Sequence, residues 1–420
     1  MKLTTRLQLS LMMFIEFFIW GSWFVTLGTF LITNLHATGA QTGSVFSTQS
    51  WGAIIAPFII GLIADRYFNA EKILGVLHLI GAGLMYYMYS VGDITAIYPE
   101  SFFFYLLAYM ILYMPTLALV NSISFNQMKD PEKEFSTIRV WGTIGWIVAG
   151  LLISYAFLWD SEESVKAGLM KNTFLMASVA SLVLGLFSFT LPKTPPKVAP
   201  GTKVKVSDIL GLDALKLLKD KNFLVFFIAS ILICIPLAFY YQNANPFLSN
   251  IGVTNPTGKM TIGQISEVLF LLMLPYFFKK FGFKKTILLG MLAWALRYAL
   301  FAYGNAGELS FMLIMGIALH GVCYDFFFVS GQIYTNAKAG EKYKSAAQGL
   351  ITLATYGIGM LIGFKTAGLI TDAYTTSQTI FDWKMIWIIP SGIALVVFLL
   401  FAISFNEKKE KPIIDQSLKI

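Results

Sequence analysis

The stretch PKTPPKVAPGTKVKVSDILGLDALKLLKDK, residues 192–221, divides this chain of 420 residues into two halves. It is rich in Pro and Lys, and charged side chains at this density do not enter a lipid bilayer. On each side of it lie six apolar runs, each close to the 20 or so residues that a membrane-spanning helix needs. The sequence therefore predicts an all-α membrane protein with twelve transmembrane helices. The expected spans are 7–32, 43–64, 73–91, 101–125, 137–158, 172–191, 222–249, 260–278, 286–304, 309–333, 345–370 and 383–405.

The basic residues alternate from one loop to the next, and this pattern predicts the orientation of the chain. One side of the membrane receives only Lys166, Lys171, Lys259 and Lys384, while Arg297 and Lys365 lie inside spans. The remaining 25 of the 31 Lys and Arg residues lie on the side that also holds both termini. Because positive residues mark the cytoplasmic face, we expect both termini in the cytoplasm.

Composition agrees with a membrane protein and excludes several other classes. Only 13% of the residues are charged, against about 25% in soluble domains. The net charge of +8 belongs to loops that contact anionic lipid, so we expect lipid contacts and no nucleic-acid partner. The sequence contains no HExxH, no GxSxG and no Cys/His ligand set. We therefore expect that the protein is not an enzyme and holds no metal or cofactor. We also expect it to be a monomer.

A weak internal repeat predicts two bundles of six helices. APFIIGLIADRYFNAEKILG in the first half and LPYFFKKFGFKKTILLG in the second both place Pro and an aromatic residue before a charged turn. Parallel six-helix repeats with a site between them are typical of the major facilitator type of transporter. The expected division is an N-terminal bundle at 1–191, a cytoplasmic linker at 192–221, a C-terminal bundle at 222–406 and a cytoplasmic tail at 407–420.

Polar side chains inside spans of the second half are the first candidate site residues, because lipid makes them costly. Gln264 and Glu267 are three residues apart and share a helix face. His320 and Tyr324 share a face of the tenth span, where Asp325 follows. Glu267 and Asp325 are candidates for carrying a proton. The structural alternatives are a hydrogen bond to a neighbouring helix for Glu267 and an ion pair with Arg297 for Asp325. Arg297 lies in the outer half of its span and Asp325 in the inner half of its own, which argues against that ion pair.

The first half and the seventh span hold further candidates. Arg139, Thr143 and Trp146 form one stripe of the fifth span, although Arg139 at its end also suits a snorkelling side chain. Tyr241 lies in IPLAFYYQNANPFL, where two prolines predict an interrupted helix lining a transport path or, alternatively, an ordinary kink. Asp65 and Arg66, on a cytoplasmic turn, are expected to act in gating or in a contact between the bundles rather than in substrate binding. Glu16 is mid-span and suits either a site or a helix contact.

Several motifs, in order, resemble the nucleoside:proton symporters of the major facilitator superfamily. They cover most of the chain and read WGSWFVTLG, YMPTLALVNSISF, IRVWGTIGW, GQISEVLF, AWALRYALFAYG, YDFFFVSG and SAAQG. The resemblance implies that substrate contacts come from Arg139, Thr143, Trp146, Gln264, Glu267 and Tyr324, with an acidic position at Asp325. His320 stands where a tyrosine is expected, and Ala238 and Tyr241 stand where Gln and Asn are expected.

The resemblance implies a secondary active transporter that imports nucleosides with protons by alternating access. A nucleoside is uncharged, with a flat base and a sugar rich in hydroxyl groups. Aromatic rings offer the base a stacking surface, and Gln and carboxylate side chains offer the sugar paired hydrogen bonds. The alternatives are a proton symporter for another small polar solute such as a sugar, which suits similar pockets, and a receptor that binds its ligand without transport.

Overall fold

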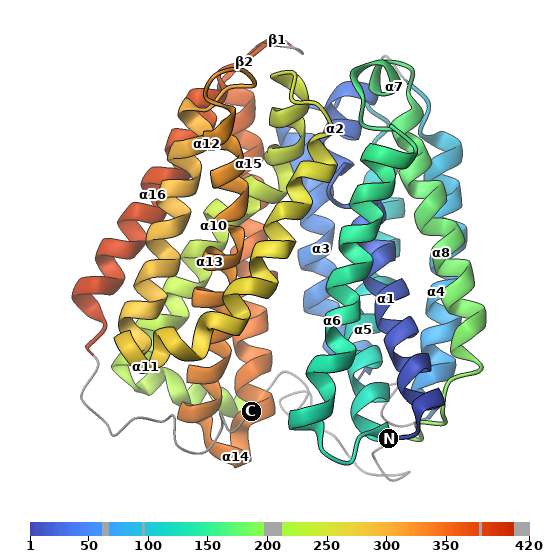
Figure 1. Ribbon diagram of the computed structural model, residues 1–420, viewed down its shortest axis with the longest axis vertical. Helices are drawn as coiled ribbons and strands as arrows, with labels where there is room; N and C mark the ends of the chain where they lie inside the picture. The colour runs from blue at the N-terminus through green and yellow to red at the C-terminus, as the bar shows by residue number, and fades with distance from the viewer. Residues whose placement is uncertain (61–66, 95–96, 197–211, 378–379, 407–420) are drawn as a thin grey trace. The chain divides into compact units, whose positions relative to one another are not determined.

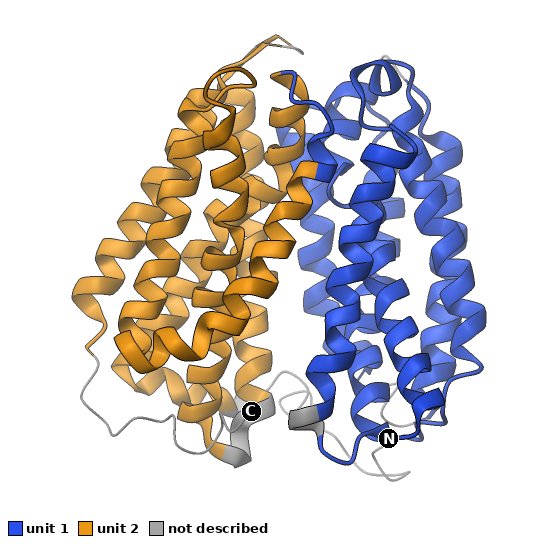
Figure 2. Ribbon diagram, in the orientation of Figure 1, with its two compact units in different colours: residues 1–204, 252–258 blue, residues 205–251, 259–420 orange. Residues whose placement is uncertain are grey.

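The computed structural model describes residues 1–60, 67–94, 97–196, 212–377 and 380–406. The described part is helical except for one short hairpin (Figure 1). The chain splits into two compact units (Figure 2). Unit 1 comprises residues 1–204 and 252–258, and unit 2 comprises residues 205–251 and 259–420.

Unit 1 is built from long helices with short helical turns between them. Its α-helices are α1 (Leu3–Trp23), α2 (Leu27–Thr29), α3 (Gly39–Ile59), α4 (Ala70–Val91), α5 (Ser101–Gln127), α6 (Pro131–Leu151), α7 (Glu162–Lys166) and α8 (Asn172–Ser188). Two π-helical stretches, η1 (Phe30–Asn34) and η3 (Leu152–Ala156), and a 3-10 turn, η4 (Leu169–Lys171), complete it.

Unit 2 has the same general construction. It contains the 3-10 helix η5 (Leu212–Lys219) and the helices α10 (Lys221–Asn250), α11 (Pro256–Tyr303), α12 (Ser310–Ala318), α13 (His320–Tyr324), α14 (Ser330–Thr352), α15 (Met360–Ala373) and α16 (Trp383–Ser404). The stretches η6 (Asp325–Val329) and η7 (Leu353–Gly359) are π-helical, and β1 (Thr375–Ser377) pairs antiparallel with β2 (Ile380–Phe381).

Side-chain caps fix where several of these helices begin. Thr38 accepts a hydrogen bond from the Gln41 backbone N–H while the Gln41 side chain accepts one from the Thr38 backbone N–H, so α3 opens on a capping box. At the start of α10 the Asp220 carboxylate accepts a hydrogen bond from the backbone N–H of Phe223. At the start of α16 the Asp382 carboxylate accepts one from the backbone N–H of Met385. Each cap satisfies backbone N–H groups that the first helical turn leaves unpaired.

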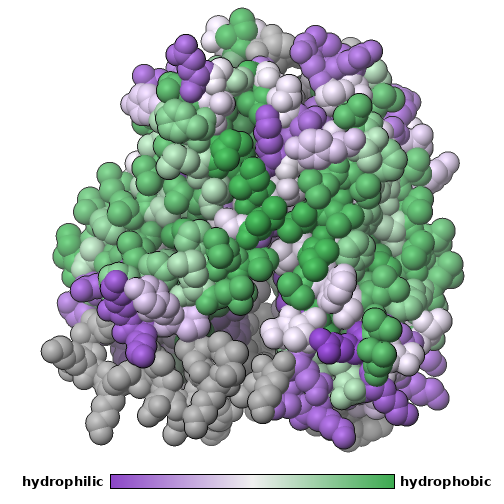
Figure 3. Space-filling model, viewed as in Figure 1, coloured by the Kyte–Doolittle hydropathy of each residue, from purple (hydrophilic) through white to green (hydrophobic). Residues whose placement is uncertain are grey.

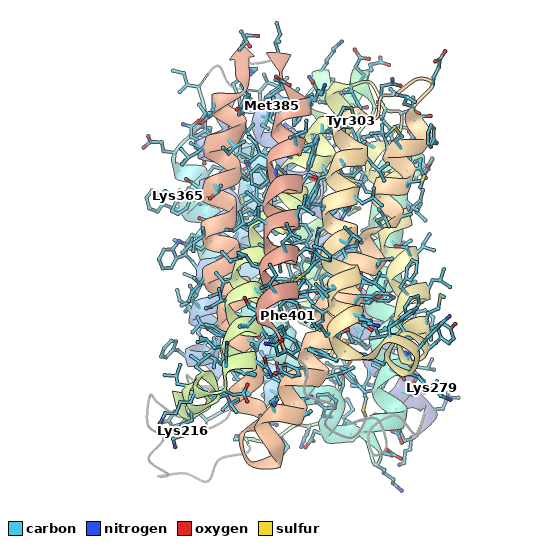
Figure 4. All side chains as sticks on the ribbon, turned by 90° about the vertical axis from the view of Figure 1, so that its left-hand side faces the viewer. Lys216, Lys279, Tyr303, Lys365, Met385 and Phe401 are labelled. Atoms are coloured by element: carbon cyan, nitrogen blue, oxygen red, sulfur yellow. The ribbon has the colours of Figure 1, made fainter. Side chains whose placement is uncertain are left out.

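Ten of the described helices are long and apolar enough to cross a membrane. One of them, α11, has 48 residues and is interrupted at Gly282, whose φ of 76° is left-handed. On the face shown in Figure 3, hydrophobic residues cover the middle of the helices, and hydrophilic ones gather near the helix ends. In unit 2, Lys216 and Lys279 lie near one end and Tyr303 and Met385 near the other (Figure 4).

The expected interruption of the seventh span is wrong. Pro236 and Pro246 both lie inside the continuous helix α10. Each proline removes one backbone N–H, which in a regular helix would donate to the carbonyl four residues earlier. The Pro236 carbonyl itself accepts a hydrogen bond from the Tyr298 hydroxyl of α11 at 2.6 Å. The polar residues Gln242 and Asn243 are buried in unit 2, so this stretch of α10 packs inside the unit.

Small residues set how closely neighbouring helices approach. A Cβ added at Gly145 of α6 would lie 2.1 Å from the Phe14 carbonyl oxygen of α1. In α3, a Cβ at Gly52 would lie 2.5 Å from the Met110 carbonyl oxygen of α5, and in α10 the residue Ala238 meets Gly363 of α15 in the same way. Contacts of this kind hold helices together in lipid, where apolar burial between helices contributes little.

The segment 252–258 belongs to unit 1 because two polar side chains hold it. The Asp160 carboxylate accepts a hydrogen bond from the backbone N–H of Thr257 at 2.9 Å. The hydroxyl of Ser154 accepts one from the N–H of Gly258 at 2.6 Å and itself donates to Asp160. Asp160 and Ser154 thereby cap the first turn of α11, where an anion is favoured by the helix dipole.

A buried polar network joins three helices of unit 1. Glu16 of α1 is fully buried and lies 2.8 Å from Nε2 of His78 in α4. The other carboxylate oxygen accepts a hydrogen bond from Thr116 of α5 at 2.6 Å, and the Tyr113 hydroxyl donates to the Glu16 backbone carbonyl at 2.8 Å. Of the two roles that the sequence leaves open for Glu16, the structure supports the contact between helices.

We expect Glu16→Ala to destabilise unit 1. The substitution leaves Nε2 of His78 and the Thr116 hydroxyl buried without their carboxylate partner, at a cost of about 3 kcal/mol. Thermal unfolding of the purified protein in detergent measures the effect as a lower midpoint. The matched control is Glu163→Ala in α7, where the carboxylate is exposed. Equal midpoints for both variants would show that the network contributes nothing to stability.

Candidate functional site

Helix α11 presents the two polar residues that periodicity assigns to one face. Gln264 and Glu267 are both half-buried. Glu267 lies close enough to Tyr241 of α10, Tyr324 of α13 and Asp325 of η6 to interact with them electrostatically. The structure therefore brings together four of the predicted side chains from four elements of unit 2. We call Tyr241, Glu267, Tyr324 and Asp325, with Tyr356 described next, the Glu267 cluster.

Tyr356 is a member of the cluster that the sequence does not reveal. It lies in the π-helical stretch η7, and its hydroxyl is 2.6 Å from the hydroxyl of Tyr324. The surrounding sequence, ATYGIGMLIG, is typical of a tightly packed glycine-rich helix. A lone tyrosine in such a run carries no periodic signal, so only the fold identifies its partner.

Close packing of α13 on α11 places Tyr324 and Asp325 beside Glu267. The backbone N–H of Gly321 donates to the Ser266 hydroxyl at 3.0 Å. A Cβ added at Gly321 would lie 2.5 Å from the Ser266 carbonyl carbon and oxygen. From Asp325 onward the helix takes the wider π-helical turn, a local departure that is frequent at functional sites.

Asp325 and His320 have different surroundings. Asp325 is buried, and its Oδ2 has no hydrogen-bond partner among the described residues. His320 is also buried, with Nδ1 3.0 Å from Nη1 of Arg297 in α11. Arg297 thus contacts His320. Among the described residues Arg297 and Asp325 do not form the ion pair that the sequence allows.

The stripe on α6 lies in unit 1 and packs against α1. The guanidinium carbon of Arg139 is 4.0 Å from the centre of the Phe17 ring, a cation–π contact. The Trp146 ring meets the Trp20 ring edge-on, with 5.6 Å between the ring centroids. Thr143, which lies between Arg139 and Trp146 in the chain, is half-buried. Aromatic side chains therefore surround both ends of the stripe. The predicted gating pair, Asp65 and Arg66, lies outside the described residues.

The two groups of side chains differ in chemistry. The unit 1 group offers a cation, a hydroxyl and an indole ring from Arg139, Thr143 and Trp146. The Glu267 cluster offers two carboxyl groups and three phenol rings. Each group provides flat aromatic surfaces and hydrogen-bonding side chains, and the carboxyl groups of the Glu267 cluster are able to bind and release a proton. Among the described residues no group of three metal-ligating side chains is present.

Comparison with known proteins agrees with this chemistry. Residues 1–410 match the family model described as nucleoside H+ symporter. YegT of Escherichia coli, named as a nucleoside transporter, is 43% identical over 96% of this chain and 94% of its own length. The xanthosine permease of Escherichia coli is 34% identical over 97% of this chain and 98% of its own length.

Solved structures show the same relationship. A crystal structure of the nucleoside transporter NupG superposes with a TM-score of 0.83 at 32% identity, covering 96% of this chain and all of that one. The peptide-transporter-family structure PepTSo, at 15% identity and a TM-score of 0.72, supports the fold alone. The fold is therefore that of an all-helical membrane transporter, and the chain is a member of the nucleoside H+ symporter family.

Proposed function

We propose that this protein imports nucleosides together with protons by alternating access. The observation that carries the proposal is the Glu267 cluster, in which carboxyl groups and phenol rings from separate elements of unit 2 meet. The family membership and the names of the relatives point the same way.

In the proposed site, rings bind the base and polar side chains bind the sugar. Trp146, Tyr241 and Tyr324 offer stacking surfaces. Gln264 and Glu267 share a helix face, so that their side chains are able to take two neighbouring hydroxyl groups of ribose. The remaining proposed contacts are Arg139, Thr143 and His320.

Glu267 and Asp325 are the proposed proton carriers. Two carboxylates that are close together and shielded from water repel each other, so one of them is favoured to hold a proton. A proton that crosses a potential of 100 mV releases about 2.3 kcal/mol. That free energy supports roughly 50-fold accumulation of an uncharged solute.

The proposed topology has twelve spans, with both termini in the cytoplasm of a bacterium and the chain as a monomer in its inner membrane. Ten helices meet the length and composition of a span. The break at Gly282 allows α11 to cross twice, and α3 supplies one more apolar helix. The bundles are proposed at 1–191 and 222–406, and Asp65 with Arg66 is proposed to act in gating. Lipids and protons are the remaining partners.

Uptake by proteoliposomes tests the proposed function. Purified protein is reconstituted, a pH gradient is imposed with the outside acidic, and radiolabelled uridine and inosine are supplied. We expect accumulation that a protonophore abolishes and that excess unlabelled uridine blocks while glucose does not. Competition by glucose, with no effect of either nucleoside, would assign the transporter to sugars. Saturable binding without accumulation would indicate a receptor.

A further inference from the structure

A buried arginine next to the Glu267 cluster has no carboxylate partner in the described part of the chain. Arg297 is 0% exposed, and its Nε and Nη2 have no hydrogen-bond partner there. None of the ion pairs among the described residues includes it. A charge buried without a counter-ion is costly, and inside a membrane span it is a marker of function.

The contacts of Arg297 include the rings of His320, Tyr240 and Phe301. Its Nη1 lies 3.0 Å from Nδ1 of His320, and its guanidinium carbon lies 3.5 Å from the centre of the Tyr240 ring. Tyr240 and His320 stack on each other with centroids 5.3 Å apart and an angle of 26°. The imidazole is thus held by a hydrogen bond at Nδ1 and by a ring against its face, which fixes its orientation.

The hydrogen bond from Arg297 also fixes the tautomer of His320. A guanidinium has donors and no acceptor, so Nδ1 of His320 must accept and must carry a lone pair. The single N–H proton of the neutral ring then sits on Nε2. A second proton on Nδ1 would remove this acceptor and place two cations side by side in a buried site. His320 therefore presents a hydrogen-bond donor at Nε2 and no acceptor.

The position of His320 brings this donor to the same stretch of α11 as the proposed substrate contacts. A Cβ added at Gly263 would lie 3.2 Å from the Cβ of His320 and 3.5 Å from Cδ2, the ring carbon bonded to Nε2. The Tyr324 ring lies 5.8 Å away, centroid to centroid. Flat rings beside His320 suit a nucleobase, whereas Glu267, an acceptor when charged, suits the hydroxyl donors of the sugar.

We propose that Arg297 is a positioning residue that holds His320 as the Nε2–H tautomer, and that His320 selects nucleosides whose base offers an oxo group. This inference rests on the proposed function and names its substrate class. Uridine and inosine carry an oxo group where cytidine and adenosine carry an amino group. An amino group facing Nε2–H opposes a donor to a donor, and an unmatched buried polar group lowers affinity by about tenfold or more.

Transport kinetics of the reconstituted full chain test the proposal with two matched pairs, uridine with cytidine and inosine with adenosine. We expect the wild-type KM to be lower for the oxo member of each pair by about tenfold. His320→Asn places an amide oxygen where Nδ1 was, so it still accepts from Arg297 but has no Nε2–H. We expect its KM for uridine to rise by about tenfold at unchanged kcat, with the selectivity lost.

Three further variants separate the donor from its orientation. His320→Gln puts an amide near the Nε2 position, which is able to donate or accept, so we expect it to take both members of each pair. Arg297→Met removes the group that fixes the tautomer, so we expect the KM for cytidine to fall relative to the KM for uridine. Arg297→Lys keeps a donor and should keep the preference. A structural role alone would lower kcat and expression without changing the ratio of KM values.

Nitrogen NMR of protein with 15N-labelled histidine gives a readout that does not depend on transport. The difference between wild-type and His320→Asn spectra identifies the His320 signals among the three histidines. We expect a protonated Nε2 and a bare Nδ1. A bare Nε2 would overturn the proposal, as would wild-type KM values that are equal within each pair. If the wild type accumulates no nucleoside, the proposed function fails instead, so the two failures are distinguishable.

Discussion

Glu267→Gln is expected to abolish accumulation driven by a pH gradient. Glutamine has nearly the shape of glutamate and keeps its hydrogen-bonding reach, but it cannot take up a proton. With a pH gradient equivalent to about 100 mV, the accumulation ratio of uridine should fall from roughly 50-fold to about 1. Exchange of labelled for unlabelled uridine across the membrane, which needs no net proton movement, should persist. Comparison of the two assays in the same proteoliposomes isolates coupling from binding.

The matched control for this variant is Glu308→Gln, the same chemical change at an exposed carboxylate of unit 2 outside the cluster. It should accumulate uridine like the wild type. Asp325→Asn is tested in the same assays, because Asp325 is the other carboxyl group of the Glu267 cluster. Full driven accumulation by Glu267→Gln would exclude Glu267 as a proton carrier and leave Asp325 as the remaining candidate.

Gly321→Ala is expected to damage both stability and substrate binding. The new Cβ would lie 2.5 Å from the Ser266 carbonyl group and 2.6 Å from the Glu267 backbone nitrogen. These are backbone atoms that no rotamer change relieves, so α13 must move away from α11, which we expect to cost about 1–3 kcal/mol. The same movement separates Tyr324 from Glu267, so we expect uridine affinity to fall by about tenfold or more.

Thermal unfolding in detergent and titration calorimetry with uridine measure the two effects. Gly392→Ala in α16 is the control, because a Cβ there meets nothing within 4 Å. It should match the wild type in both measurements. Wild-type stability and affinity in Gly321→Ala would mean that α13 and α11 are not packed as closely as described, and the geometry of the Glu267 cluster would have to be revised.

Local patterns in the sequence were sufficient to predict helical segments and several of the site residues, but not the partners of those residues on other helices. Apolar runs predicted that these segments are helical, and ten of the described helices have the length and composition of a membrane span, because burial in lipid acts on each segment separately. A spacing of three residues put Gln264 and Glu267 on one face, since helical periodicity is a local property. The stripe at Arg139, Thr143 and Trp146 followed from the same rule.

The partners of these residues were decided only by the tertiary structure. Tyr356 beside Tyr324, Arg297 beside His320 and His78 beside Glu16 are pairs whose members lie on different helices. No spacing along the chain encodes such pairs, because they depend on how far each helix is shifted and rotated against its neighbours. The structure also shows that α10 continues through Pro236 and Pro246, which the two prolines alone do not indicate. The sequence by itself determined which segments are helical and which faces are polar, while close packing at small residues determined which polar groups meet.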